Sequence, residues 1–517
     1  MRGYRQARWN EPIVYEYPPR SGAKPRPVED EIVAEVGSLE IPGSLDRGSP
    51  PSMPALSETE LVRHLTRLAE MSYGVDSGPV PLGSCTMKYN PRIALRYAYD
   101  ERITRVHPLQ DDETVQGILE IMYEVQEWLA HILGMDACTL HPAAGAHGEL
   151  AGALLTRWYH KIRGQLDVKN EIIVPDSAHG TNPATASMAG FRVVEVPTGE
   201  DGNVDWNALE SVIGEATAGL MITNPSTLGL FEERIMDIAR LIREVDGILY
   251  YDGANLNGIL GHARPGDMGF DVAHVNLHKT FSAPHGGGGP GSGPVCVKDR
   301  KVTEEIMLSD LLPGPRVVKE DGSYHLRWPS KGPVMIRAWQ ANTPVVVWAY
   351  IYMLALGAEG LRQAGELSVV NTNYFIARLR GVRGYSIPFG PGRYRKHEVV
   401  VSAEPLRRET GVTAEDVAKM LLDRGFHAPT IYFPLIVPEA LMIEFTETET
   451  KENIDAYVDA LAEIAREAYK NPDRAREAPN NTASRRVNAV KANHPRSVTP
   501  TWRVKRLRDE GVIGPLR

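Results

Sequence analysis

Cysteine is scarce in this sequence of 517 residues, which contains only Cys85, Cys138 and Cys296. The three lie far apart, and no two form the CxxC pair of zinc sites and redox motifs. Disulfide frameworks occur mainly in oxidising compartments and use even numbers of cysteines. The pattern therefore predicts a fold without disulfides, in a reducing environment.

Long apolar runs and excess positive charge are missing as well. No stretch reaches the roughly 20 apolar residues that a membrane-spanning helix needs, and the N-terminal run MRGYRQARWNEPIVYEYPP lacks the apolar core of a secretory signal. The formal net charge is −9, whereas nucleic-acid binding usually requires a basic surface. We therefore expect a soluble, cytoplasmic protein that binds neither membranes nor nucleic acid.

The composition of the chain changes along its length and suggests four regions. Residues 1–56 are rich in proline, glycine and charge, which predicts an extended arm, and residues 57–360 are predicted to form a large α/β domain that starts with a helical segment. Residues 361–470 have fewer, longer elements, typical of a small α+β domain. Residues 471–517 form a basic tail, which we interpret as solvated or wrapped around a partner; an RNA-binding tail is the alternative.

Helices and strands can be placed coarsely. Residues 57–71 are predicted to form a helix that starts with a capping box of Ser57 and Glu60, and 113–133 to form a second, with apolar residues on one face. From residue 171, the apolar runs EIIVP, FRVVEV, GLMIT, GILYYD, VAHVNL and GPVCV alternate with helical stretches. This alternation is typical of an α/β domain with a mainly parallel sheet. The small domain is expected to contain helices near 364–380, 413–425 and up to Tyr469, and strands in HEVVVSAE and LMIEF.

A lysine follows one of these runs directly, in the segment HVNLHKTFSAPHGGGGPGSGP. The lysine amine forms an imine with carbonyl compounds once burial and neighbouring charges lower its pKa. The glycines after Lys279 permit tight turns beside a bulky ligand, but they are no P-loop, in which the lysine follows the glycines. Most lysines are simply solvated, so the pattern is weak alone. We take Lys279 as the candidate that holds pyridoxal phosphate (PLP) as a Schiff base.

Asp252, in YYDGAN at the end of another apolar run, is the candidate partner of the pyridine nitrogen. A buried carboxylate needs a cationic partner, and a protonated pyridine ring is one, which would also make PLP a better electron sink. One βα crossover separates Asp252 from Lys279, so neighbouring strands can present both to one ring. A helix cap or a metal ligand is the alternative.

Small residues open a predicted helix in HPAAGAHGE. At such a helix start, the N–H groups of Ala144, Gly145 and Ala146 can bind phosphate with the help of the helix dipole. A simple tight turn before a helix is the alternative.

Three histidines lie in or near the expected loops. His179, in SAHGTNP, is a candidate to stack on an aromatic cofactor or to donate a proton; a structural hydrogen bond is the alternative. His274 and His278 have the i,i+4 spacing of zinc ligands on a helix, but on a strand such side chains stand about 13 Å apart. No metal site is therefore predicted, and His278 is expected to contact the phosphate.

Several long motifs occur in a fixed order: PLGSCTMKYNP, SAHGTNPA, TNPSTLGLFEE, YYDGANLNG, RPGDMGFDV and the lysine segment. Through them residues 50–450 resemble the P-proteins of the glycine cleavage system, the glycine dehydrogenases (decarboxylating). The resemblance is to the lysine-bearing second subunit of the split, two-subunit type. It implies an oxidoreductase of PLP fold type I, aspartate-aminotransferase-like, with a large mainly parallel-sheet domain and a small C-terminal α+β domain.

The resemblance also implies roles for single residues. Lys279 would carry PLP, His179 would stack on its ring, and Asp252 would pair with the ring nitrogen. Thr227 and His278 would surround the phosphate together with the turn at 144–146.

One departure from the family pattern concerns this turn. HPAAGAHGE has alanine and histidine where many relatives have serine and glutamine. Ala144 can therefore offer the phosphate only its N–H.

The implied reaction is glycine decarboxylation, with release of CO₂ and transfer of the aminomethyl group to the lipoyl arm of H-protein. The implied partners are a homologous subunit 1 without the lysine, in an α2β2 heterotetramer, and the T-protein and L-protein of the system. Two alternatives stay open: another fold-type-I PLP enzyme, such as an amino-acid decarboxylase or desulfurase, and a non-catalytic partner protein. Lys279 argues against the second.

Overall fold

The computed structural model describes residues 11–14, 17, 34–35, 42–46, 48, 54, 56–285, 291–333, 335–494, 506–507 and 509–512. Two units are formed. Among the described residues, the first contains 74–421 and 426–476, and the second contains the residues up to 73, 422–425 and those from 477 onwards.

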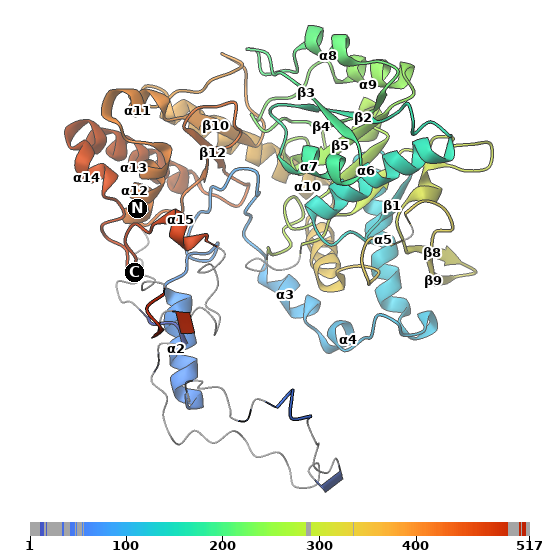
Figure 1. The fold of residues 1–517 in the computed structure, drawn as a ribbon, viewed down its shortest axis with the longest axis horizontal. Coiled ribbons are helices and arrows are strands. Elements are labelled where there is room, and N and C mark those ends of the chain that lie inside the picture. The colour runs from blue at the N-terminus through green and yellow to red at the C-terminus, as the bar shows by residue number, and fades with distance from the viewer. Residues whose placement is uncertain are drawn as a thin grey trace. The chain divides into compact units, whose positions relative to one another are not determined.

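A seven-stranded sheet forms the centre of the first unit (Figure 1). Its order is β1-β7-β6-β5-β4-β2-β3, and all neighbours are parallel except β7, which runs antiparallel to both β1 and β6. The strands are β1 Ala137–Thr139, β2 Glu171–Pro175, β3 Arg192–Val196, β4 Thr217–Thr223, β5 Ile248–Gly253, β6 Val272–Val275 and β7 Val295–Val297. The six strands expected from apolar runs are confirmed, and so is the mainly parallel sheet.

Helices cover both faces of this sheet. Side chains alternate along each strand, so each strand contributes apolar residues to a core on either face. On β5, Leu249 and Tyr251 belong to one apolar core, and Ile248 and Tyr250 belong to the other. The first core also includes α5 Gln116–Leu133 and α9 Ile235–Glu244, and the second includes α6 Gly145–Ile162 and α7 Thr181–Met188. The remaining elements of this region are α3 Arg92–Ala98, α4 Glu101–Thr104, η2 Asp112–Thr114, α8 Trp206–Val212, η3 Leu256–Gly258, η4 Pro265–Met268, η5 Leu308–Leu311, β8 Arg316–Glu320 and β9 Ser323–Arg327.

A smaller three-stranded antiparallel sheet follows, in the order β10-β12-β11. We call the part of the first unit built on this sheet the small domain. Its elements are β10 Glu398–Ser402, α11 Glu404–Thr410, α12 Ala414–Asp423, β11 Thr430–Ile431, β12 Ala440–Glu444, α13 Lys451–Lys470 and α14 Pro472–Arg476. The expected strands and helices of this α+β region are confirmed.

Helix α10, Thr343–Leu379, begins 21 residues before the helix expected at 364–380. Its first half is apolar on several sides and packs into the core of the large domain, so it lacks the one-sided pattern that reveals a surface helix. The helix kinks at Gly357, whose φ of 61° lies in the left-handed region. By length and composition α10 could span a membrane, and 44% of its most apolar window is buried inside the protein.

The second unit contains α2 Glu58–Glu70 and α15 Ala489–Ala492. The capping box of α2 is confirmed: Ser57 accepts a hydrogen bond from the N–H of Glu60, and the Glu60 carboxylate accepts one from the N–H of Ser57. This helix was predicted to open the large domain, but it belongs to the second unit. It instead buries only His64, against Glu11, and leaves its apolar stripe exposed.

The prediction of a fold without disulfides is wrong. Cys138 on β1 and Cys296 on β7 lie directly opposite each other in the sheet and form a disulfide. They are 158 residues apart, and only the antiparallel pairing of β1 with β7 brings them together. Spacing along the chain therefore gave no sign of the bond.

Candidate active site

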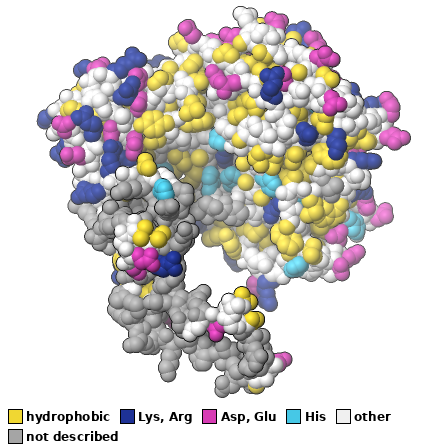
Figure 2. Space-filling view, viewed as in Figure 1, with side chains coloured by type: hydrophobic (Ala, Val, Ile, Leu, Met, Phe, Trp, Pro, Cys, Tyr) yellow, Lys and Arg dark blue, Asp and Glu magenta, His cyan; other side chains and the backbone are white. Residues whose placement is uncertain are grey.

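The predicted site residues follow strands of the large sheet at the carboxyl ends of those strands. Asp252 lies in β5, and Lys279, His179 and Thr227 come four residues after β6, β2 and β4, respectively. In open α/β sheets, ligands bind beyond this edge. Figure 2 shows histidine side chains gathered in a hollow near the middle of the face in view.

Lys279 lies in a tight turn. Its N–H donates to the carbonyl of Asn276 (3.1 Å), and its own carbonyl accepts from the N–H of Ser282 (3.2 Å). The charge of Lys279 acts on Asp252, His179 and His278, so the structure brings the predicted lysine close to three of its predicted partners.

Asp252 is fully buried and surrounded by donors. Its carboxylate accepts from the N–H of Ala254 (3.0 Å) and from Asn182 Nδ2 (3.3 Å), and His274 Nε2 lies 3.5 Å away. Burial raises the pKa of Asp252, but His274, the N–H of Ala254 and Lys279 act against burial, and the pKa stays below its usual 3.8. Asp252 is therefore an ionised carboxylate that can face a cationic ring nitrogen.

The start of α6 has the properties of a phosphate site. Ala144 is its N-cap, and no side chain caps the helix. The N–H groups of Gly145 and Ala146 have no acceptor in the described part of the chain, so they can bind an anion with the help of the helix dipole. A Cβ on Gly145 would lie 2.3 Å from Asn276 Nδ2, so the helix start packs directly against the Lys279 turn.

His278 lies where it can add a side-chain donor. Its Nδ1 accepts from the N–H of Ser292 (3.2 Å). Burial, with the charges of His285 and Lys279, lowers the pKa of His278 to about 3. The ring is therefore neutral and carries its proton on Nε2, which leaves that N–H to donate.

His179 and Thr227 belong to neighbouring loops. His179 Nδ1 accepts from the N–H of Thr181 (3.2 Å), and its ring contacts the edge of Phe433 at 5.5 Å. Thr227 Oγ1 donates to the carbonyl of Ser177, which holds the loop that carries His179. Stacking of His179 and phosphate contact by Thr227 stay predictions.

Three residues that received no role from the sequence lie in the site. Glu149 and His274 offer side-chain atoms that lie, with one from Asp252, within 4.8 Å of one another. The ring of His285 lies 5.1 Å from that of His278. His274 is the direct register partner of Asp252 on the next strand, so strand pairing could have revealed it. Glu149 ends the quoted motif HPAAGAHGE, but its burial could not be read from the sequence.

The residues fit PLP. Two buried hydroxyls beside the Lys279 turn, Thr280 Oγ1 and Ser292 Oγ, have no hydrogen-bond partner in the described residues. Buried polar atoms usually have partners. A polar ligand with an anionic group and a ring nitrogen provides them, with the α6 N-terminus at one end and Asp252 at the other.

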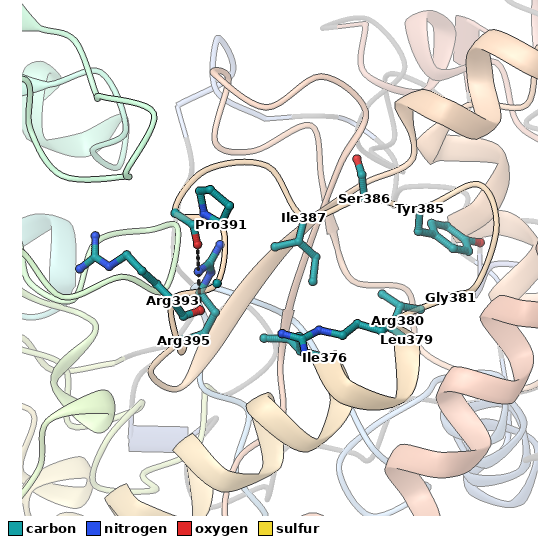
Figure 3. Close-up of a pocket in the computed structure, with 12 residues that line it drawn as sticks. Ile376, Leu379, Arg380, Gly381, Tyr385, Ser386, Ile387, Pro391, Arg393 and Arg395 are labelled. Atoms are coloured by element: carbon teal, nitrogen blue, oxygen red, sulfur yellow. Dashed lines mark hydrogen bonds between the residues drawn. The ribbon is translucent and has the colours of Figure 1, made fainter.

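A cavity of about 290 Å³ lies elsewhere, in the small domain (Figure 3). It is lined by none of the predicted site residues. The buried Arg395 donates to the carbonyls of Phe389 and Gly390, and Arg393 bonds to Glu233 (2.9 Å) and to the Phe231 carbonyl. We interpret both arginines as structural: Arg395 stabilises its own loop, and Arg393 connects that loop to the large domain.

Comparison with known proteins agrees with the fold. An aminotransferase class-V family model matches residues 152–298, and one for the glycine dehydrogenase C-terminal domain matches residues 364–486. A crystal structure of glycine decarboxylase (P-protein) of the glycine cleavage system, in inhibitor-bound form, superposes with a TM-score of 0.69 at 21% identity, covering 85% of this chain and 99% of that one. A NifS-like protein superposes with a TM-score of 0.56 at 17% identity, covering 75% and 100%. The chain has the fold of type I PLP-dependent enzymes.

Sequence relatives identify the family. "Probable glycine dehydrogenase (decarboxylating) subunit 2" of Aeropyrum pernix is 66% identical, over 99% of this chain and 100% of that protein. The protein of the same name from Staphylothermus marinus is 61% identical, over 97% and 98%. The chain belongs to the family of glycine dehydrogenase (decarboxylating) subunit 2.

Proposed function

We propose that this chain is the PLP-bearing subunit of a decarboxylating glycine dehydrogenase. The observation that carries the proposal is the convergence of Lys279, the ionised Asp252 and the open N-terminus of α6 at one edge of the sheet. The names of the relatives support glycine as the substrate and a subunit 1 as the partner.

Each residue has a task in this proposal. PLP, when bound, supplies an electron sink for the electrons left on the glycine α-carbon as CO₂ departs. The Lys279 amine would hold the cofactor covalently. Asp252 keeps the ring nitrogen protonated, and the α6 N–H groups and His278 Nε2–H bind the phosphate.

The further steps involve other proteins. We propose that the aminomethyl group passes to the lipoyl arm of H-protein, that subunit 1 completes an α2β2 heterotetramer, and that T-protein and L-protein finish the cycle. The resemblance of the long motifs to P-proteins supports these steps.

The test is exchange of ¹⁴C between bicarbonate and the glycine carboxyl group. We expect exchange only when this chain, subunit 1, H-protein and PLP are combined. Efficient exchange by this chain alone would exclude the two-subunit arrangement, and release of sulfur from cysteine without exchange would favour a desulfurase. Borohydride reduction followed by peptide mapping should place the cofactor on Lys279, and Lys279→Ala should lose that adduct.

A further inference from the structure

The proposed function gives no task to the motif PLGSCTMKYNP. Residues 83–90 of this motif, which we call the strap, connect the small domain to the Lys279 turn. At one end, the N–H of Gly83 donates to the carbonyl of Met442 in β12 (3.1 Å). At the other, Asn90 Nδ2 donates to the carbonyl of Ser282 (2.7 Å), and Ser282 Oγ donates to the carbonyl of Tyr89 (3.0 Å). Ser282 lies three residues after Lys279, so the strap joins the two parts of the site.

The strap is held in a strained conformation. Ser84 has a φ of 68° and Thr86 a φ of 46°, both in the left-handed region. This region costs a residue other than glycine roughly 1–2 kcal/mol. Strong contacts must therefore keep the strap in place.

Two buried glutamates of the small domain make those contacts. Glu398 accepts from the N–H of Ser84 (2.8 Å) with one oxygen and from Asn255 Nδ2 (2.8 Å) with the other. Glu444 Oε2 accepts from the N–H (2.9 Å) and the hydroxyl (3.1 Å) of Thr86. Glu444 Oε1 is buried and without a hydrogen-bond partner in the described residues.

Each of the two carboxyl groups disfavours ionisation of the other. A side-chain atom of each lies, with a ring nitrogen of His397, within 4.8 Å of the others, and all three residues are buried. Burial raises the pKa of both glutamates, and the charge of Glu398 raises the pKa of Glu444 further. The charge of Lys279 lowers the pKa of Glu398, and that of Lys88 lowers the pKa of Glu444, but burial outweighs both. His397 offers no positive charge, because burial and the same two lysines lower its pKa to about 3.

The hydrogen bonds decide which group keeps the proton. Both oxygens of Glu398 accept from N–H donors, an arrangement that suits a carboxylate. Glu444 has a free oxygen, Oε1, that can carry a proton without losing a bond. The charge therefore belongs to Glu398 and the proton to Glu444. Asp252 and Lys279 also face Glu398, and Cys85 of the strap faces both glutamates and Lys279.

We propose that ionised Glu398 and protonated Glu444 clamp the strap, and that Glu398 is a positioning residue for Lys279. The clamp rests on the contacts alone. The effect on the lysine rests on the proposed function, because it requires that Lys279 carries the cofactor.

Glutamine substitutions distinguish the two glutamates. Glu444→Gln can keep the acceptor for Thr86 and places an NH₂ where the proton was, so the strap should stay in place. Glu398→Gln puts an NH₂ against one of two N–H donors, so the strap should be released. The control is Glu232→Gln, which alters another buried glutamate that holds backbone N–H groups, those of Val204 and Arg234.

Cys85 provides a readout that needs neither cofactor nor activity, because the two other cysteines are joined in the disulfide. We would measure alkylation of folded protein by iodoacetamide over a range of pH. For each variant we would fit the thiol pKa, which burial and both glutamates raise, separately from the rate constant of the ionised thiol, and compare the rate constants. We expect an increase of about tenfold or more in Glu398→Gln, since opening the strap exposes the thiol, and less than about twofold in Glu444→Gln and Glu232→Gln.

Two outcomes would overturn the clamp: equal release by both substitutions, or none by either. A bound divalent metal, detected by elemental analysis of purified protein and lost equally in both variants, would also overturn it, because the glutamates would then be ligands of that ion.

The effect on Lys279 is tested with the cofactor bound, through the pH dependence of its absorbance near 420 nm. Loss of the negative charge of Glu398 should lower the pKa of the lysine Schiff base by roughly one unit, and Glu398→Asp should restore part of the shift. Glu444→Gln should leave this pKa unchanged. An unchanged pKa in Glu398→Gln, with Cys85 released, would refute the positioning role and keep the clamp. Wild-type protein without this absorbance would instead refute the proposed function.

Discussion

Single residues in the site depend on their neighbours for their charge. Asp252 is ionised although it is buried, because donors surround it, whereas Glu149, a few ångströms away, is not. Burial and the charge of Asp252 raise the pKa of Glu149 to about 9. One of two adjacent carboxyl groups is therefore ionised, as the proposed pairing with a ring nitrogen requires, and the other stays neutral.

Asp252→Ala should keep the fold and lose most of the exchange activity, since no anion then opposes the ring nitrogen. We expect a loss of at least about 100-fold, which corresponds to about 2.7 kcal/mol of transition-state stabilisation. The ¹⁴C-exchange assay with subunit 1 and H-protein measures it, and Asp237→Ala on the half-exposed face of α9 is the control. Near wild-type exchange in Asp252→Ala would mean that this carboxylate does not pair with the ring.

Glu149→Gln should be tolerated, because glutamine mimics the neutral acid, whereas Glu149→Ala leaves a cavity. The pKa of Glu149 is raised from 4.5 to about 9 on folding, so its contribution to stability is complete below pH 4.5 and is lost as the pH rises towards 9. One such proton changes stability by about 1.4 kcal/mol per pH unit. Urea unfolding of the cofactor-free protein at pH 6 and 8 should show a shallower decline for Glu149→Gln than for wild type. Parallel declines would indicate that Glu149 is ionised.

At the scale of elements, the site depends on how closely α6 approaches the sheet. A Cβ on Gly152 would lie 2.1 Å from the ring of Tyr250, a fully buried side chain whose hydroxyl is 2.7 Å from His274 Nδ1. The glycine therefore allows α6 to lie on β5 and β6 and sets the position of the N-terminus of α6, which we propose as the phosphate site.

Gly152→Ala should consequently push α6 away from the sheet. We expect a loss of about 1–3 kcal/mol in the free energy of unfolding and a weaker affinity for PLP, measured by urea titration and by cofactor titration. Gly117→Ala is the matched control, because Gly117 also lies in a helix and a Cβ there would meet nothing within 4 Å. Gly117→Ala should stabilise the protein slightly, because alanine has a higher helix propensity than glycine. Equal effects of both substitutions would refute the packing argument.

The elements also show what the sequence could and could not predict. Six of the seven strands of the large sheet have an apolar run of their own, and Asp252 and Lys279 lie at or just after the ends of such runs, so local patterns sufficed for them. The three-residue strand β1 was not predicted. His274 received no role because its spacing was compared only with His278 along the chain, whereas its partner Asp252 lies on the neighbouring strand. The clamp of the strap by Glu398 depends on residues 314 positions apart, which no local pattern can reveal.

At the scale of the whole molecule, the disulfide joins two segments that each lead into the site. β1 precedes the Ala144–Ala146 turn, β7 follows the Lys279 segment, and the N–H of Gly293 donates to the carbonyl of Pro142 between them (3.1 Å). The bond thus fixes β1, which leads into the Ala144–Ala146 turn, relative to β7, which follows the Lys279 segment. Because it closes a long loop, its loss should cost the folded protein stability.

The thiol count tests the bond directly. Iodoacetamide under denaturing conditions should label one thiol per chain, Cys85, before reduction and three after it. The double variant Cys138→Ala, Cys296→Ala should lose about 2–5 kcal/mol of unfolding free energy, and reductant present throughout should bring wild type close to that value. Cys85→Ala should change stability little, since Cys85 takes no part in the bond. Three reactive thiols before reduction would show that the two cysteines face each other across the strands as free thiols. The original expectation of a disulfide-free protein would then be correct for the molecule in solution, and β1 and β7 would be held together by their hydrogen bonds and apolar contacts alone.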